Sequence, residues 1–178
     1  VAGEGEGVER ELRKGPGVEG EGAGWRTKGD ERFLWAVVAL RYVVYTVAPT
    51  RGSAVLIRLL GAVFRGVLCS DRFSAYLKYH SGTAQFCWAH LKRNLLGIVE
   101  FTKSSAVERF CRDALAEHAR LFRLWHKFRS GQIDRRRLVL RSIPIQKRLF
   151  FLAERHLDST HREVGNLATA LFEHNQRL

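Results

Sequence analysis

The 178-residue chain contains no methionine and only three cysteines, and it has no long uncharged apolar stretch. A missing methionine, even at position 1, indicates a piece of a longer reading frame. Three widely spaced cysteines are too few for a disulfide framework and are typical of a reducing compartment. Spanning a bilayer takes about 20 apolar residues, and the start at Val1 lacks the parts of a signal peptide. We therefore expect a cytoplasmic protein that does not bind a membrane.

Acidic residues are scarce relative to basic ones. Thirty Lys and Arg against 18 Asp and Glu give a formal net charge of +12. Such a balance favours a polyanionic partner, with nucleic acid as the first candidate, although Lys and Arg also serve as plain solubilising residues. No helix-turn-helix or zinc-finger spacing indicates base-specific reading. The basic residues that favour contact with a DNA backbone recur at helical spacing or cluster, namely Arg109, Arg112, Arg120, Arg123, Lys127, Arg129, Arg135, Arg136, Arg137 and Arg141.

Composition divides the chain into three parts. Residues 1–24 alternate Gly and Glu with little to bury, so they are predicted to form a flexible segment. Residues 25–100 are predicted to form an α/β core, and residues 101–178 a basic helical region. Apolar runs rich in β-branched and aromatic residues predict strands. The expected order is strands over 33–40 and 42–48, a helix over 54–61 capped by Ser53, and strands over 66–70 and 83–87, which together make a mixed sheet.

Beyond Ala89 the apolar spacing becomes helical. Leu91, Leu95, Ile98 and Val99 predict one buried helix face. A second buried face is predicted from Leu115, Ala119, Phe122 and Trp125, and Pro144 is expected to end or kink a later helix. The acids of this region alternate with basic residues and are interpreted as solvated charges, namely Glu100, Glu108, Glu154 and Glu163.

Asp71 is the first candidate functional residue, because it directly follows an apolar strand. A carboxylate at the end of a buried strand lies on the rim of a sheet, where it is well positioned to hold a metal ion. The alternative is an Asp that opens a turn or caps the next helix. Further along, Cys87 and His90 form a Cys-x-x-His pair that could bind zinc together with Cys69. No second such pair follows and Trp88 resembles a core anchor, so a zinc site is not favoured.

Four segments, in this order, resemble the transposases of the insertion sequence 66 family. They are Gly24-Trp25-Arg26, Ala48-Pro49-Thr50-Arg51-Gly52, Ser70-Asp71-Arg72-Phe73-Ser74-Ala75-Tyr76 and Cys87-Trp88-Ala89-His90-Leu91-Lys92-Arg93. The resemblance covers about residues 24 to 178. It implies an RNase H-like catalytic domain that uses a DDE acid triad and Mg2+ to cut and join DNA. The implied partners are transposon ends and target DNA, and the parent enzyme is expected to form a homo-oligomer.

The resemblance also assigns roles to residues. Asp71 matches the second acid of the triad, and Glu21 occupies the place of the first, four residues before Trp25. The third acid would fall after Leu178, so the chain by itself is expected to be inactive. His90, Lys92 and Arg93 are expected to contact phosphate beside the acids, and Arg135, Arg136 and Arg137 to contact DNA. Two alternatives stay open, a noncatalytic DNA-binding remnant and a small zinc-stabilised module that binds nucleic acid or protein.

Overall fold

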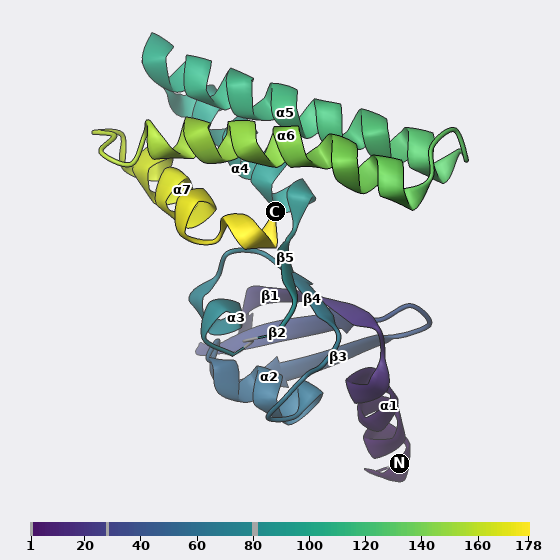
Figure 1. Cartoon of the computed structure of the whole chain (residues 1–178). Coiled ribbons are helices and arrows are strands. Elements are labelled where there is room, and N and C mark those ends of the chain that lie inside the picture. Colours follow the sequence, from purple (N-terminus) through teal and green to yellow (C-terminus); the bar gives the residue numbers. More distant parts are fainter. Residues whose placement is uncertain (1, 28, 80–81) are drawn as a thin grey trace. The chain divides into compact units, whose positions relative to one another are not determined.

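The computed structural model describes residues 2–27, 29–79 and 82–178. The chain divides into two compact units, one reaching to Cys87 and one beginning at Trp88 (Figure 1). Composition predicts a division near residue 100. In the structure the last strand ends at Phe86, and Leu91, Leu95 and Ile98 of the following helix belong to the helical core. In the described part of the chain, no helix is both long and apolar enough to cross a membrane.

The first unit is built on a five-stranded sheet with the order β3-β2-β1-β4-β5. Its strands are β1 (Gly17–Thr27), β2 (Asp30–Val38), β3 (Val43–Ala48), β4 (Val67–Ser70) and β5 (Ala84–Phe86). Strands β1, β2 and β3 pair antiparallel, whereas β4 pairs in parallel with both β1 and β5. This mixed sheet confirms the predicted α/β class and fits the RNase H-like arrangement that the resemblance implies.

The Gly/Glu-rich start differs from the flexible segment expected for residues 1–24. Helix α1 spans Ala2–Lys14, and β1 begins at Gly17. Strand β1 lies in the middle of the sheet and therefore pairs its backbone with β2 on one side and β4 on the other. Helix α1 is held by Leu12, which is fully buried, and by Arg13, which donates hydrogen bonds to the carbonyls of Arg58 and Leu59. Composition alone does not reveal such pairing, because the partners lie far away in sequence.

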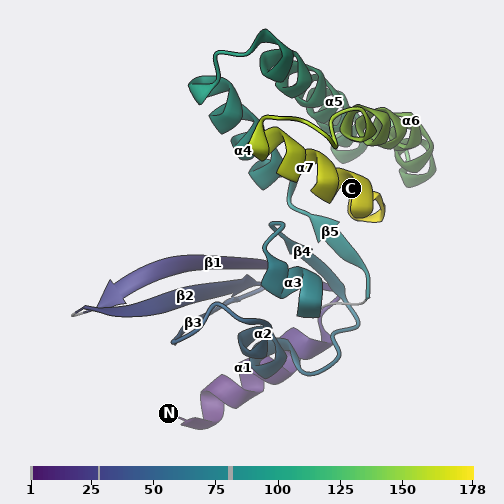
Figure 2. The ribbon, with the colours of Figure 1, turned by 90° about the vertical axis from the view of Figure 1, so that its left-hand side faces the viewer.

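Helices cover one face of this sheet. Helix α2 (Ser53–Leu60) lies beside α1 on the same side of the sheet (Figure 2), and α3 (Ser74–Tyr79) adds Tyr76 to the same core. The buried core residues of the sheet unit include Leu12, Val18, Trp35, Val37, Leu56, Leu59, Leu60, Leu68 and Tyr76. The predicted Ser53 cap is wrong, because Ser53 is the first helical residue and Gly52 occupies the cap position without a side-chain hydrogen bond.

The second unit is entirely helical. It contains α4 (Trp88–Phe101), α5 (Ser105–Arg129), α6 (Arg135–Glu154), α7 (Arg162–Glu173) and a short 3-10 turn at Asn175–Arg177. Helices α5 and α6 run side by side in opposite directions (Figure 1). Side-chain caps begin both of them, since Ser104 accepts a hydrogen bond from the Val107 N–H and Asp134 accepts one from the Arg137 N–H. The shared core includes Leu91, Leu95, Phe110, Ala114, Leu149, Val164, Leu167 and Leu171.

Two helix predictions need correction. The buried face of α5 is formed by Val107, Phe110, Cys111, Ala114, Glu117 and His118, whereas Ala119 and Trp125 of the predicted face are exposed. Apolar residues occur on both sides of this helix, so periodicity did not reveal which side packs. Pro144 lies inside α6, which continues to Glu154, so the expectation that this proline ends a helix is wrong, whereas the expectation of a kink stays a prediction. Ile145, Leu149 and Leu152 of the same helix are buried, and burial of apolar side chains favours a helix despite the backbone hydrogen bond that proline cannot make.

Candidate functional site

Two acidic residues occupy matching backbone positions, one on β1 and one directly after β4. The parallel register pairs Gly20 with Ser70. Asp71 is the next residue after β4, so continuing this register by one residue sets Glu21 alongside Asp71. Both acids are partly buried. The two residues predicted to be catalytic acids are thus neighbours in the backbone register, and their catalytic role stays a prediction.

Tyr76 of α3 lies within electrostatic reach of both acids. Burial raises the pKa of Tyr76 most, and the negative charges of Asp71 and Glu21 raise it further. Its ring fits beneath β1 only because position 20 is glycine, since a Cβ on Gly20 would lie 2.6 Å from Tyr76 Cε1. The Tyr76 hydroxyl is buried, and among the described residues it has no hydrogen-bond partner. A buried polar group without a hydrogen-bond partner in the described part of the chain thus lies within electrostatic reach of both carboxylates.

Asp71 also organises the turn that leads into α3. Its Oδ1 accepts a hydrogen bond from the Phe73 N–H at 2.9 Å. This is the turn-opening role that the sequence analysis kept as an alternative, and it uses one of the two carboxylate oxygens. Asp71 further interacts with the neighbouring Arg72, whose pKa is lowered by burial and partly restored by the Asp71 charge. The turn fixes the direction of the Asp71 side chain.

Arg51, a residue without a predicted role, contacts both segments that carry the two acids. Its Nη2 donates a hydrogen bond to the carbonyl of Gly22, the residue after Glu21, at 3.0 Å. Its guanidinium lies 4.0 Å from the ring centroid of Phe73, in cation–π contact. The Arg51 charge also opposes the rise in the Tyr76 pKa. Arg51 occurs in the matched segment after β3, which was the one available signal for its importance.

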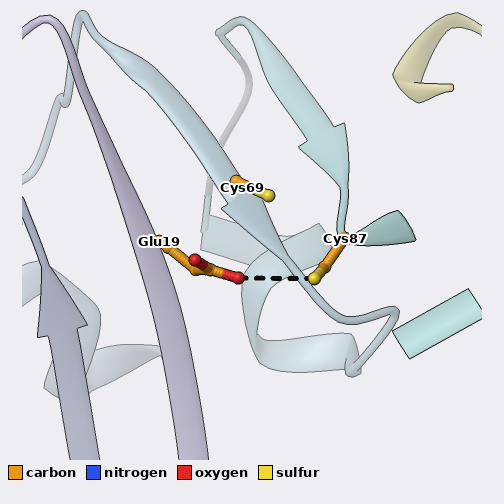
Figure 3. Close-up of side chains that lie close together, drawn as sticks. All are labelled: Glu19, Cys69 and Cys87. Atoms are coloured by element: carbon orange, nitrogen blue, oxygen red, sulfur yellow. Dashed lines mark hydrogen bonds between the residues drawn. The ribbon is translucent and has the colours of Figure 1, made fainter. Parts of the chain in front are cut away.

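A second cluster of side chains begins two residues before the two acids, on the same strands β1 and β4. Glu19 is the register partner of Cys69, and the Cys87 thiol donates a hydrogen bond to Glu19 Oε1 at 3.3 Å (Figure 3). Burial, with the nearby Cys87 and Glu19 adding to it, raises the pKa of Cys69 to about 12. The Cys87 backbone N–H donates to the Ser70 carbonyl at 2.7 Å. The zinc set considered from sequence, Cys69, Cys87 and His90, did not include Glu19.

The rest of the Cys-Trp-Ala-His segment belongs to α4 of the helical unit. Trp88 packs against the core of that unit and lies edge-on to the His118 ring, with centroids 5.9 Å apart. This contact confirms that Trp88 is a core anchor. His90 is partly buried, whereas Lys92 and Arg93 are exposed. Their expected contact with phosphate stays a prediction.

Basic side chains line a hollow between α5 and α6. It has a volume of about 280 Å³, and its lining residues are Arg120, Arg123, Leu124, Lys127, Arg141, Ile145 and Arg148. Five of these seven residues are cationic and none is acidic. The exposed Arg135, Arg136 and Arg137 form the first turn of α6, where the helix dipole disfavours positive charge. Their expected contact with DNA stays a prediction.

One acid in the helical unit differs from the others. The four acids interpreted as solvated, Glu100, Glu108, Glu154 and Glu163, are exposed as predicted. Glu117 is only 5% exposed, and its Oε1 accepts hydrogen bonds from Arg120 and from Arg148 Nε, the latter at 2.9 Å. These bonds raise the pKa of Arg148. Glu117 was not selected from the sequence, although it lies 3, 7 and 10 residues after Ala114, Phe110 and Val107 and shares their buried helix face.

A comparison with known protein families identifies the chain. The family model described as "Transposase IS66 family" matches residues 18–178, a range that contains Glu21, Asp71 and the basic helices. No curated protein sequence matches. Most of the chain is covered by this match, and its sheet has the mixed order expected for the family. The chain belongs to the IS66 family of transposases.

Proposed function

We propose that the sheet unit supplies two cation-binding acids of a transposase catalytic centre, Glu21 and Asp71, and that the helical unit binds the DNA backbone. The observation that carries the first half is the parallel register of β1 and β4, which sets the two acids side by side. The observation that carries the second is the cationic hollow between α5 and α6.

The residues around the acids suit Mg2+. This ion prefers oxygen ligands, and proteins bind it through one or two carboxylates while waters and substrate phosphates complete the shell. Glu21 and Asp71 provide the carboxylates, and the buried Tyr76 hydroxyl offers a hydrogen-bonding group for a water of the hydrated ion. Held by Glu21 and Asp71, Mg2+ would supply positive charge to the reacting oxygens of a phosphodiester.

The chain's own groups prepare this site in three ways. Asp71 is oriented by its bond from the Phe73 N–H, and the strand backbone at Glu21 is held through the Arg51 bond to Gly22. The positive charge of Arg51 partly offsets the repulsion between two neighbouring carboxylates. Because a two-metal centre needs a third acid, we assign cation binding to Glu21 and Asp71, and cleavage and strand transfer to the centre that they form together with a third acid.

Cation binding is the direct test. Mn2+, which is paramagnetic and replaces Mg2+ in oxygen sites, is titrated into the chain and into Glu21→Gln and Asp71→Asn. Asn keeps an oxygen for the Phe73 N–H, so Asp71→Asn removes charge without removing the turn. Each variant is expected to bind Mn2+ at least about 10-fold more weakly. Glu31→Gln on β2 is the control, because Glu31 is exposed and should leave binding unchanged.

The second candidate function is DNA binding without chemistry, and the hollow between α5 and α6 favours it. Measurements of Mn2+ affinity and DNA affinity distinguish the two candidate functions. If Mn2+ affinity is the same in all variants while DNA affinity is high and depends on salt, the noncatalytic function replaces the first. If Glu21→Gln and Asp71→Asn lose Mn2+ and DNA binding persists, both halves of the proposal stand.

A further inference from the structure

Three potential metal ligands converge from three neighbouring segments of the sheet. Glu19 lies in β1, Cys69 in β4, and Cys87 directly after β5. One ligand atom from each lies within 4.8 Å of the other two (Figure 3). Within residues 2–27, 29–79 and 82–178, this is the only group of three His, Cys, Asp or Glu residues that come so close.

Backbone hydrogen bonds hold these ligands in place. Glu19 and Cys69 are direct partners in the parallel β1–β4 register. Cys87 is held beside β4 because its N–H donates to the Ser70 carbonyl at 2.7 Å. Ligands anchored by paired strands lose little conformational freedom when a metal binds, so the cluster is preorganised.

We propose that Glu19, Cys69 and Cys87 form a zinc site. Two thiolates and one carboxylate are ligands that Zn2+ accepts, at about 2.3 Å for sulfur and about 2.0–2.2 Å for oxygen. In a tetrahedral shell such ligand atoms lie about 3.4–3.8 Å from one another. Cys87 Sγ and Glu19 Oε1 already lie 3.3 Å apart. Small side-chain shifts therefore complete the geometry, and the fourth position stays open for water.

The chemistry of this cluster separates it from the acid pair. Thiolates select zinc over Mg2+, which prefers oxygen. Zinc binding displaces the two thiol protons to solvent and replaces the hydrogen bond between Cys87 and Glu19. The site shares no ligand with Glu21 and Asp71, so it does not rest on the proposed catalytic role. By joining β1, β4 and the end of β5, it would fix the strand that carries Glu21.

Cobalt spectroscopy tests the site. Co2+ is titrated into the whole purified chain in the presence of a phosphine reductant, and Zn2+ is then added to displace it. The expected result is one equivalent of tetrahedral Co2+ with a thiolate-to-cobalt charge-transfer band in the near ultraviolet. Cys69→Ser and Cys87→Ser should weaken Zn2+ binding by at least about 100-fold and reduce this band, and Glu19→Gln should weaken binding by about 10-fold.

Cys111→Ser is the matched control, because Cys111 is a buried free cysteine in the helical unit. It should leave the cobalt bands unchanged, as should Glu21→Gln. X-ray absorption of the unaltered zinc-loaded chain gives the ligand set without any variant, and two sulfur ligands are expected. A shell of only nitrogen and oxygen, or a charge-transfer band that survives in both Cys69→Ser and Cys87→Ser, would overturn the proposal.

Discussion

The sheet unit and the helical unit position their charged groups by different physical means. In the sheet unit, the register of two parallel strands sets Glu21 and Asp71 at neighbouring backbone positions, and a shift of one residue would turn Glu21 to the other face. In the helical unit, the cations of α5 and α6 line a hollow through the spacing of helix turns. The first arrangement depends on exact backbone geometry, whereas the second depends mainly on total charge.

The largest expected effect tests the close packing of Tyr76 against β1 at Gly20. Gly20→Ala places a methyl group where only 2.6 Å separates it from Tyr76 Cε1, so the ring or the strand must move. We expect the free energy of unfolding to fall by about 1–3 kcal/mol, measured by chemical denaturation. Gly24→Ala is the control on the same strand, because nothing lies within 4 Å of its Cβ position. Equal losses from both changes would contradict the close packing of Tyr76 beneath β1.

The next effect tests whether the helical unit works through total charge. Arg123→Ala combined with Lys127→Ala removes two cations from the hollow. Losing two phosphate contacts should weaken duplex DNA binding by roughly 30-fold at physiological salt and lower the slope of log K against log salt by about 2. The control is Arg26→Ala combined with Arg41→Ala, which makes the same charge change at exposed positions of the sheet unit. If the control lowers the slope equally, the hollow is not the contact surface.

A smaller effect concerns the one buried acid of the helical unit. Glu117→Gln neutralises the group that binds Arg120 and Arg148, and it should lower the free energy of unfolding by about 1–2 kcal/mol. Thermal unfolding measures the loss. Glu108→Gln is the matched control, because Glu108 is exposed in the first turn of α5 and should cost about 0.5 kcal/mol through the helix dipole. A loss no larger than that of Glu108→Gln would show that the buried contacts do not stabilise the helix pair.

The smallest effect returns to the sheet unit. Tyr76→Phe removes a buried hydroxyl that lacks a hydrogen-bond partner in the described part of the chain. Without metal, stability should stay unchanged or rise by less than about 1 kcal/mol, since no bond is lost. With metal, Mn2+ affinity should fall severalfold if the hydroxyl binds a water of the ion. A clear loss of stability without metal would mean that the hydroxyl has a partner.

Strands were predictable where the sequence has continuous runs of apolar, β-branched or aromatic residues. The β-branched and aromatic runs around Leu34 and Val44 predicted β2 and β3, and the apolar run before Asp71 predicted β4. The residues that local patterns did not reveal depend on distant partners. Glu19 becomes a candidate metal ligand only because Cys69 and Cys87 lie close to it in space. Glu117 becomes a stabilising acid only because it accepts a hydrogen bond from Arg148. Composition predicted flexibility for residues that in fact form α1 and the central strand β1.

The sequence by itself determined the family, the basic character and the identity of the acid after β4, because these follow from residue types and short spacings. Only the tertiary structure decided that Glu21 lies alongside Asp71, that Glu19 joins two thiols, and which face of α5 is buried. The physical reason is that strand register and helix packing bring together residues far apart in the chain. The local sequence sets the preference of each segment for helix or strand. The segment against which it packs or pairs lies elsewhere in the chain.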